Sequence, residues 1–322
     1  MNNLNYSDKP KIYNNHSTII YSFSNFVIKK NKFNNSNNKY YINEINILKN
    51  IKNKNICNLL KYEDYNSFFY LKLEKCDYNL RNYIENKSNS YDFEICTGII
   101  NGLKFLYENN IVHRDLKPEN ILIKDFTISK ICDFGLSKIL DHNKQYMKTI
   151  CGTPLYMAPE IIIDKTYNNK IDLWSLGIIF FEIFFHKYPY EGDTHNELLT
   201  NIISSSVTIP KNNIPFKIIN LITILIQNKV EKRIEWFDLF NENYFEKDIE
   251  LNFNDLFDCT NEDCDDFICS FEDITEIPER KHNNEIKIIN TPNDNMFTIH
   301  RTLSDLELNN FNNKDKIDKT FK

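Results

Sequence analysis

Residues 113 to 120 read His-Arg-Asp-Leu-Lys-Pro-Glu-Asn, and Asp133-Phe134-Gly135 begins eighteen positions after Asp115. The two segments supply two carboxylates, an amide and an ammonium group. Phosphoryl transfer requires such a set: a carboxylate to accept the proton of the attacking hydroxyl, a carboxylate and an amide to hold magnesium, and a cation to neutralise the moving group. In the order of these roles, the candidates are Asp115, then Asp133 with Asn120, and then Lys117.

At these residues the chain resembles the eukaryotic protein kinases, whose signature is a catalytic loop of this kind followed by a metal-binding Asp-Phe-Gly. The resemblance implies an α+β, bilobal protein kinase fold with ATP and Mg²⁺ as cofactors and proteins as substrates. It places a small, mainly β N-lobe with one regulatory helix at residues 12–73. A hinge at 74–77 and a larger, mainly α C-lobe at 78–245 complete the expected kinase domain.

The resemblance also assigns residues to the nucleotide side of the cleft. Lys29 matches the strand lysine that holds the α and β phosphates, and Glu44 matches the helix glutamate that pairs with it. Lys30 is the alternative to Lys29, but strand alternation puts the two on opposite faces, and the register favours Lys29. Ile20 and Val27 are expected to line the adenine pocket. The expected hinge contacts are the backbone groups of Glu74 and Cys76, with Leu73 at the back of the pocket.

A second group of residues resembles the activation segment of serine/threonine kinases, which here runs from Asp133 to Glu160. Residues 148–160 are similar to the polo-like and Unc-51-like groups, and Lys117 is typical of the serine/threonine branch. Thr149 is the candidate phosphate acceptor, because a phosphate there would stabilise Arg114. Thr153 is expected to hydrogen-bond Asp115 and Lys117.

Three further positions are expected to build the site without reacting. Glu160 should form a buried ion pair with Arg233, and Asp172 should brace the backbone of the catalytic loop.

The glycine-rich turn of the family is missing, because the chain has no glycine before Gly98. Its place is taken by residues 13–18, Tyr-Asn-Asn-His-Ser-Thr. Asn14 and Asn15 are expected to substitute in part for glycine, because asparagine tolerates left-handed conformations better than most residues. This departure, with Val27 in place of a smaller alanine, predicts weaker ATP binding. It also motivates an alternative function: a pseudokinase scaffold that binds partners through its helical lobe and acidic tail.

The rest of the chain predicts local structure. Ile19-Ile20-Tyr21, Phe26-Val27-Ile28 and Phe68–Leu73 are typical of strands. Two sets of apolar residues have helical spacing: Ile42, Ile45, Leu48 and Ile51, followed by Ile95, Ile99, Leu103 and Leu106. The apolar run from Leu173 to Phe185 is too short for a membrane span and contains Glu182, so it predicts a buried helix and no membrane partner.

Charge separates the two ends of the chain. The protein has 322 residues and a net charge of −6, but residues 246–322 hold 19 Asp and Glu against 9 Lys and Arg. This acidic, Asn-rich tail predicts disorder and a possible basic partner, whereas residues 1–11 read as an N-terminal extension. The basic residues form no stripe, which argues against a nucleic-acid partner.

The first residues, Met-Asn-Asn-Leu-Asn, have neither a basic region nor an apolar one, so no secretory signal is predicted. An intracellular, cytoplasmic location and reduced cysteines follow as expectations. The abundance of Asn, Ile and Lys suggests an AT-rich genome, such as that of a protist or a large DNA virus. For a virus, the expected location is the host cytoplasm.

Overall fold

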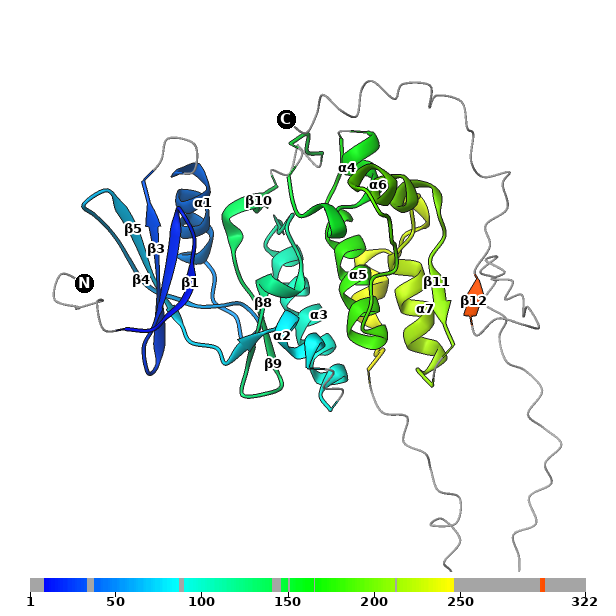
Figure 1. The fold of residues 1–322 in the computed structure, drawn as a ribbon, viewed down its shortest axis with the longest axis horizontal. Coiled ribbons are helices and arrows are strands. Elements are labelled where there is room, and N and C mark those ends of the chain that lie inside the picture. Colours follow the sequence, from blue (N-terminus) through cyan, green and yellow to red (C-terminus); the bar gives the residue numbers. More distant parts are fainter. Residues whose placement is uncertain are drawn as a thin grey trace, which may run out of the picture.

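The N-lobe is built on a five-stranded antiparallel sheet packed beside one helix (Figure 1). The structure, a computed structural model, describes residues 9–33, 38–86, 90–140, 146–149, 151–164, 166–211, 213–245 and 296–298. The strand order in the sheet is β1-β2-β3-β5-β4. The strands are β1 (Lys11–Asn14), β2 (Thr18–Ser22), β3 (Phe26–Lys32), β4 (Leu59–Tyr65) and β5 (Phe68–Glu74).

The register of this sheet decides which side chains enter the interlobe cleft. Lys29 of β3 lies opposite Ile20 of β2 and Leu71 of β5. Directly opposite residues share a face, so these three side chains form a row on one side of the sheet. Lys30 projects to the other side, where its ammonium group lies 4.0 Å from the centre of the Phe68 ring.

The helix of the N-lobe, α1 (Asn38–Leu48), is shorter than its apolar pattern predicted. The predicted stripe included Ile51, which lies beyond the end of the helix, in the connection to β4. Ile45 and Leu48 are buried, but Ile42 is 47% exposed. Three-residue spacing drifts around a helix of 3.6 residues per turn, so the four residues could not all share one buried face.

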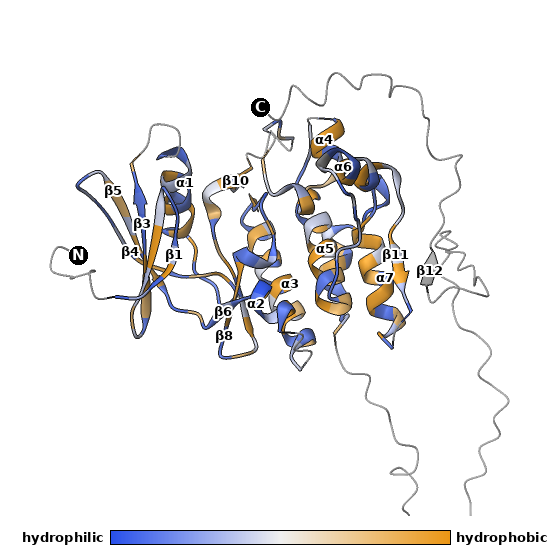
Figure 2. Ribbon diagram, viewed as in Figure 1, coloured by the Kyte–Doolittle hydropathy of each residue, from blue (hydrophilic) through white to orange (hydrophobic). Residues whose placement is uncertain are grey.

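The C-lobe is predominantly helical and its core surrounds α5 (Figure 1). Every residue of α5 from Ile171 to Ile183 is buried, as the apolar run in the sequence predicted. The predicted stripe of α3 is also buried, from Ile95 to Leu106. Figure 2 shows hydrophobic residues concentrated on α5 and α7. The C-lobe helices are α2 (Leu80–Glu85), α3 (Asp92–Glu108), α4 (Pro159–Ile163), α5 (Ile171–Phe185), α6 (His195–Ser204), α7 (Phe216–Leu225) and α8 (Trp236–Asn241).

Short strands and 3-10 turns lie in the segments that connect the longer elements. One small sheet has the order β6-β8-β9, and a second pairs β7 with β10. These strands are β6 (Tyr78–Asn79), β7 (Ile111–Val112), β8 (Ile121–Lys124), β9 (Ile128–Ile131) and β10 (Lys138–Ile139). The 3-10 turns are η1 (Pro118–Asn120), η2 (Phe134–Leu136), η3 (Pro154–Tyr156) and η4 (Val230–Lys232).

Residues 246–322 fall outside the described part of the chain, apart from β12 (Met296–Thr298), so the predicted disorder of the tail is not addressed. β12 pairs antiparallel with β11 (Thr208–Pro210) of the C-lobe. Among the described residues, none of the helices has the length and apolar character needed to cross a bilayer.

A buried carboxylate at the start of α3 makes the stability of the fold depend on pH. Asp92 accepts a 2.8 Å hydrogen bond from the Tyr83 hydroxyl, and burial raises the pKa of its carboxyl group to about 6. In an unfolded chain an aspartate has a pKa of about 3.9. The folded state therefore binds the proton more tightly, and this group lowers the free energy of unfolding as pH rises from about 4 to about 6.

We therefore expect Asp92→Asn to stabilise the protein at pH 7.5 by about 1–2 kcal/mol, allowing for partial screening by solvent. The gain should shrink towards zero at pH 4.5, because the wild-type carboxyl is then protonated. Urea denaturation at the two pH values measures the difference, with the exposed Asp193→Asn as control. An equal gain at both pH values would contradict the assignment.

Candidate functional site

The ammonium group of Lys29 joins β3, α1 and the Asp-Phe-Gly segment. Its Nζ lies 2.9 and 2.8 Å from the two carboxylate oxygens of Glu44 and 3.2 Å from Oδ1 of Asp133. Lys29 and Asp133 are 104 positions apart in the chain. The structure therefore brings together, at the junction of the lobes, three residues that the sequence assigned to one cleft.

The charges in this cluster reinforce one another. Burial opposes the protonated form of Lys29, but Asp133 and Glu44 outweigh it and raise the pKa of the ammonium group above its usual range. Lys29 in turn lowers the pKa of Asp133, against the effect of burial. Both groups are therefore charged at neutral pH, and the Asp133 side chain remains 47% exposed towards the cleft.

Asn43, which sequence reasoning missed, holds the Asp-Phe-Gly segment against α1. Its Nδ2 donates to three backbone carbonyls, of Phe134 at 3.0 Å, Gly135 at 3.1 Å and Ser137 at 2.8 Å. Asp133 itself has a φ of 64°, a left-handed conformation that aspartate tolerates better than most residues. The position of Asn43 beside Glu44 is the only signal in the sequence that could have drawn attention to it.

Asp115 is surrounded by donors from two segments. Its Oδ1 accepts from the Thr153 hydroxyl at 2.9 Å, and its Oδ2 accepts from Lys117 Nζ at 2.8 Å and Asn120 Nδ2 at 3.1 Å. Lys117 also donates to Thr153 at 2.7 Å. The arrangement presents a fixed, partly desolvated carboxylate beside a cation, which is what a group that accepts a proton during phosphoryl transfer requires.

The loop that carries Asp115 is tied to α5 through Asp172. The two carboxylate oxygens of Asp172 accept the backbone N–H groups of His113 at 2.7 Å and Arg114 at 2.9 Å. Burial raises the pKa of Asp172, and these backbone hydrogen bonds partly oppose the change. Arg114 has a φ of 68°, and two charge-assisted hydrogen bonds help hold this strained backbone in place.

Gly152 brings the activation segment close to the same loop. Its φ is 112°, which favours glycine, and a Cβ atom there would lie 2.8 Å from the carbonyl oxygen of Arg114. The Arg114 side chain donates from Nε to the carbonyl of Leu136 at 2.6 Å. Thr149 is exposed, and its carbonyl accepts a hydrogen bond from the Tyr167 hydroxyl.

Glu160 and Arg233 form a buried, bidentate ion pair. Nη1 and Nη2 of Arg233 lie 2.7 and 3.0 Å from the two oxygens of Glu160, and the Arg233 side chain is fully buried. The guanidinium group also donates to the carbonyls of Lys170 and Gln227. This buried cluster anchors the end of the activation segment and contacts none of the residues assigned to phosphoryl transfer, as a structural role requires.

On the nucleotide side, Val27 lies opposite Leu73 and shares the sheet face of Ile20 and Lys29. The Glu74 side chain does not face this pocket: it accepts the Asn58 N–H at 2.7 Å and forms an ion pair of 2.9 Å with Lys130. Only backbone groups of Glu74 and Cys76 therefore suit the expected adenine contacts.

The turn between β1 and β2 differs from the expectation. Neither Asn14 nor Asn15 has a positive φ. Instead, Oδ1 of Asn15 accepts the backbone N–H of Ser17 at 3.0 Å and of Thr18 at 2.6 Å. The prediction of left-handed asparagines is therefore wrong, because a side-chain carbonyl closes this turn without unusual dihedrals.

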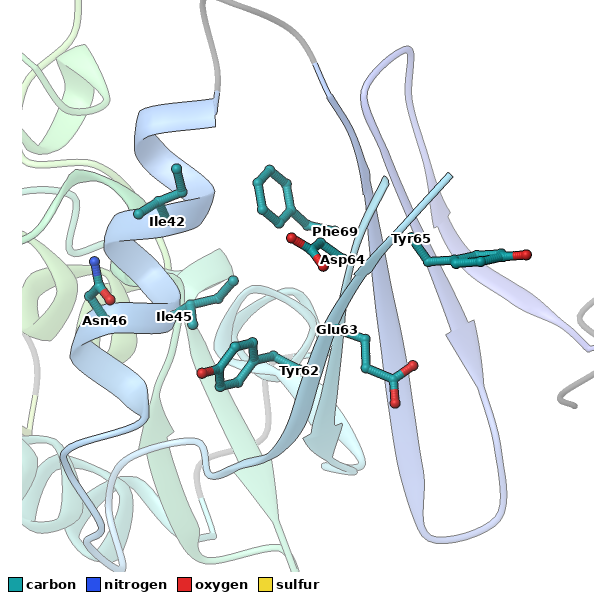
Figure 3. Close-up of a pocket in the computed structure, with 8 residues that line it drawn as sticks. All are labelled: Ile42, Ile45, Asn46, Tyr62, Glu63, Asp64, Tyr65 and Phe69. Atoms are coloured by element: carbon teal, nitrogen blue, oxygen red, sulfur yellow. The ribbon is translucent and has the colours of Figure 1, made fainter. Parts of the chain in front are cut away.

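A separate groove of about 630 Å³ lies between α1 and β4. Figure 3 shows Ile42 and Ile45 of α1 on one side of it, with Tyr62 and Phe69 of the sheet on the other. The groove contains none of the residues assigned to phosphoryl transfer, so it is distinct from the candidate active site. Helix α1 thus presents Glu44 to the site and Ile42 and Ile45 to the groove.

Comparisons with known proteins agree with this geometry. The family model described as "Protein kinase domain" matches residues 13–245. The serine/threonine-protein kinase atg1 of Dictyostelium discoideum is 38% identical over 224 residues, which cover 66% of this chain and 33% of that protein. The serine/threonine-protein kinase sgk-1 of Caenorhabditis elegans is 38% identical over 167 residues, covering 52% of this chain and 34% of its own length.

A viral relative, R517/R518 of Acanthamoeba polyphaga mimivirus, is 28% identical over 264 residues, covering 71% of this chain and 59% of its own length. The chain thus spans about a third of the length of the atg1 and sgk-1 relatives. The match over residues 13–245, with a five-stranded N-lobe and a helical C-lobe, shows that the chain belongs to the protein kinase family and has its bilobal fold.

Proposed function

We propose that the protein is a serine/threonine protein kinase, which transfers the γ-phosphoryl group of ATP to hydroxyl groups of protein substrates. The observation that carries the proposal is the contact of Lys29 with both Glu44 and Asp133, because it assembles the nucleotide side of the cleft. The names of the relatives support the same activity. Lys117 and its partner Thr153 support transfer to serine or threonine.

The proposed mechanism is direct in-line transfer. The acceptor hydroxyl binds beside Asp115, which orients it and accepts its proton as the new O–P bond forms and the bond to the leaving ADP oxygen breaks. Lys117 neutralises charge on the transferred group, and its 2.8 Å contact keeps it beside Asp115. Lys29 positions the α and β phosphates, and Glu44 fixes the direction of the lysine.

The residues expected to hold magnesium fit that role by their chemistry. Nδ2 of Asn120 donates to the Asp115 backbone carbonyl at 2.8 Å, so the amide presents its oxygen as the free ligand atom. Asp133 is a carboxylate with a lowered pKa, and the backbone N–H of Cys132 beside it donates to the backbone carbonyl of Asn120 at 2.9 Å. Oxygen donors of this kind suit Mg²⁺, which would neutralise the phosphate charges.

The alternative, a pseudokinase scaffold, rests on the glycine-free turn. The amides of Ser17 and Thr18 point at Asn15 in place of a phosphate. This turn lowers the affinity expected for ATP, but it removes none of the side chains proposed for transfer. We therefore retain the enzyme as the proposed function, with residues 12–245 as its kinase domain.

Regulation is proposed to act through Thr149. The residue is exposed on the segment that leads to Gly152, whose backbone approaches Arg114. A phosphate on Thr149 would offer acceptor oxygens to Arg114, whose guanidinium group contacts two neutral groups, the Leu136 carbonyl and the Tyr167 side chain. We also propose an intracellular location and a basic protein partner for the acidic tail.

Phosphorylation of a generic basic protein with radiolabelled ATP tests the proposed function. Asp115→Asn should lower incorporation at least about 100-fold, because general base and positioning contributions are lost. The matched control is Asp125→Asn, on the turn between β8 and β9. Equal incorporation by wild type and Asp115→Asn would refute the enzyme and leave the scaffold.

The turn between β1 and β2 predicts a gain of function. Asn15→Ala frees two backbone N–H groups for the nucleotide, so KM for ATP should fall by about threefold, equivalent to ~0.7 kcal/mol, with kcat unchanged. Asn14→Ala, on the neighbouring strand position, serves as control. A raised KM in Asn15→Ala would mean that the side chain supports ATP binding.

Thr149→Ala should have a kcat about tenfold or more below that of the phosphorylated wild type, with its binding of ATP intact. Phosphatase treatment of the wild type should reproduce the loss. Mass spectrometry of the active protein locates the phosphate. Unchanged activity of Thr149→Ala would remove this residue as the regulatory site.

A further inference from the structure

Arg81 connects four segments at the base of the cleft. Asn79 caps α2 by accepting the Asn82 N–H, which places Arg81 in the first turn of that helix. All three parts of its guanidinium fork are engaged. Nε donates to Glu119 at 2.9 Å, Nη1 donates to Glu182 at 2.6 Å, and Nη2 donates to the Tyr156 hydroxyl.

The two carboxylates around Arg81 differ in burial. The Glu182 side chain, on α5, is 2% exposed, and its second oxygen accepts the Tyr156 hydroxyl at 2.6 Å. Glu119, on η1, is 43% exposed and is bonded through one oxygen only in the contacts described. Burial raises the pKa of Glu182, and the hydrogen bond from Tyr156 and the positive charge of Arg81 oppose this change.

This cluster includes residues of the two segments that meet at Asp115. Glu119 belongs to the loop that carries Asp115, and Tyr156 follows Thr153, whose hydroxyl contacts Asp115 at 2.9 Å. A peptide whose hydroxyl reaches Asp115 therefore runs between these two segments. Glu119 is 43% exposed, whereas Tyr156 and Glu182 are buried, and the guanidinium group of Arg81 lies between Glu119 and these two residues.

Without Arg81, the exposed carboxylate of Glu119 would lie beside an open position, and the buried carboxylate of Glu182 behind it would lack its cation. Such a pair would bind an arginine of the substrate through a bidentate, charge-assisted contact. With Arg81 in place, both oxygens of Glu182 are occupied, and an incoming basic side chain meets a positive charge. The guanidinium group of Arg81 therefore occupies the position that an arginine of the substrate could otherwise fill.

We propose that Arg81 is a specificity-determining residue that makes the enzyme indifferent to basic residues beside the acceptor, so that its substrates are peptides without a required arginine or lysine there. This inference rests on the proposed kinase function. It assigns the absence of a basic preference to one side chain of α2. Its removal should convert the protein to a kinase directed by arginine.

A degenerate peptide library, phosphorylated by the full-length protein, tests the inference. The wild type should show no enrichment for arginine or lysine at any position. Arg81→Ala should select arginine at one position by about tenfold, the size expected for one charge-assisted contact. Arg81→Lys keeps the positive charge and should retain the wild-type profile. Arg81→Ala with Glu182→Gln should lose the new preference, because no buried carboxylate then requires a cation.

A structural role for Arg81 alone would leave peptide selection unchanged, so identical profiles of wild type and Arg81→Ala would overturn the inference. Enrichment for arginine in the wild type would also overturn the inference. This measurement on the wild type remains decisive in the case that Arg81→Ala does not fold. Fluorescence anisotropy with an arginine-containing peptide and its alanine counterpart separates the two proposals. A lack of phosphorylation by any form counts against the kinase function, whereas tighter binding of the arginine peptide by Arg81→Ala still supports the inference, and equal binding refutes it.

Discussion

The ammonium group of Lys29 is the contact on which the geometry of the cleft depends, because it ties a strand, a helix and a loop of the other lobe to one point. Glu44 is 2% exposed, so removing Lys29 would leave a buried carboxylate without its cation. Breaking one half of a buried pair typically costs about 3–5 kcal/mol. The same ammonium group reaches Asp133 at 3.2 Å, so the stability of the N-lobe and the placement of a proposed metal ligand share one interaction.

A second constraint on the site comes from the side chains of α5. This helix is buried on all sides and carries Asp172, which holds the backbone of the catalytic loop, and Glu182, which holds Arg81. The side chains proposed to react lie on loops, and Asp172 and Glu182 lie on the buried helix α5. Loops can keep a fixed geometry when they are held in this way, because the helix supplies hydrogen-bond partners for backbone groups that would otherwise lack them.

The contiguous motifs explain why so much of this architecture could be predicted. Asp115, Lys117 and Asn120 lie within six positions, so their contacts follow from one local loop, and the buried run of α5 was evident from its composition. Asn43 and Arg81 could not be found in this way, because their partners lie far away in the chain and an isolated Asn or Arg on a helix is ordinarily solvated. The turn at Asn15 was predicted from backbone tolerance, whereas a side-chain hydrogen bond determined it.

The balance of charge in the cleft bears on the proposed cofactor. Lys29 is shared by Glu44 and Asp133, and Lys117 is paired with Asp115, so these five residues carry a net charge of −1 before any ligand binds. A triphosphate adds several more negative charges to a partly desolvated space, where repulsion is stronger than in water. The two lysines are already committed to carboxylates and cannot offset that charge alone. Divalent cations that arrive with the nucleotide would offset it, and Asn120 and Asp133 are the residues proposed to supply their oxygen ligands.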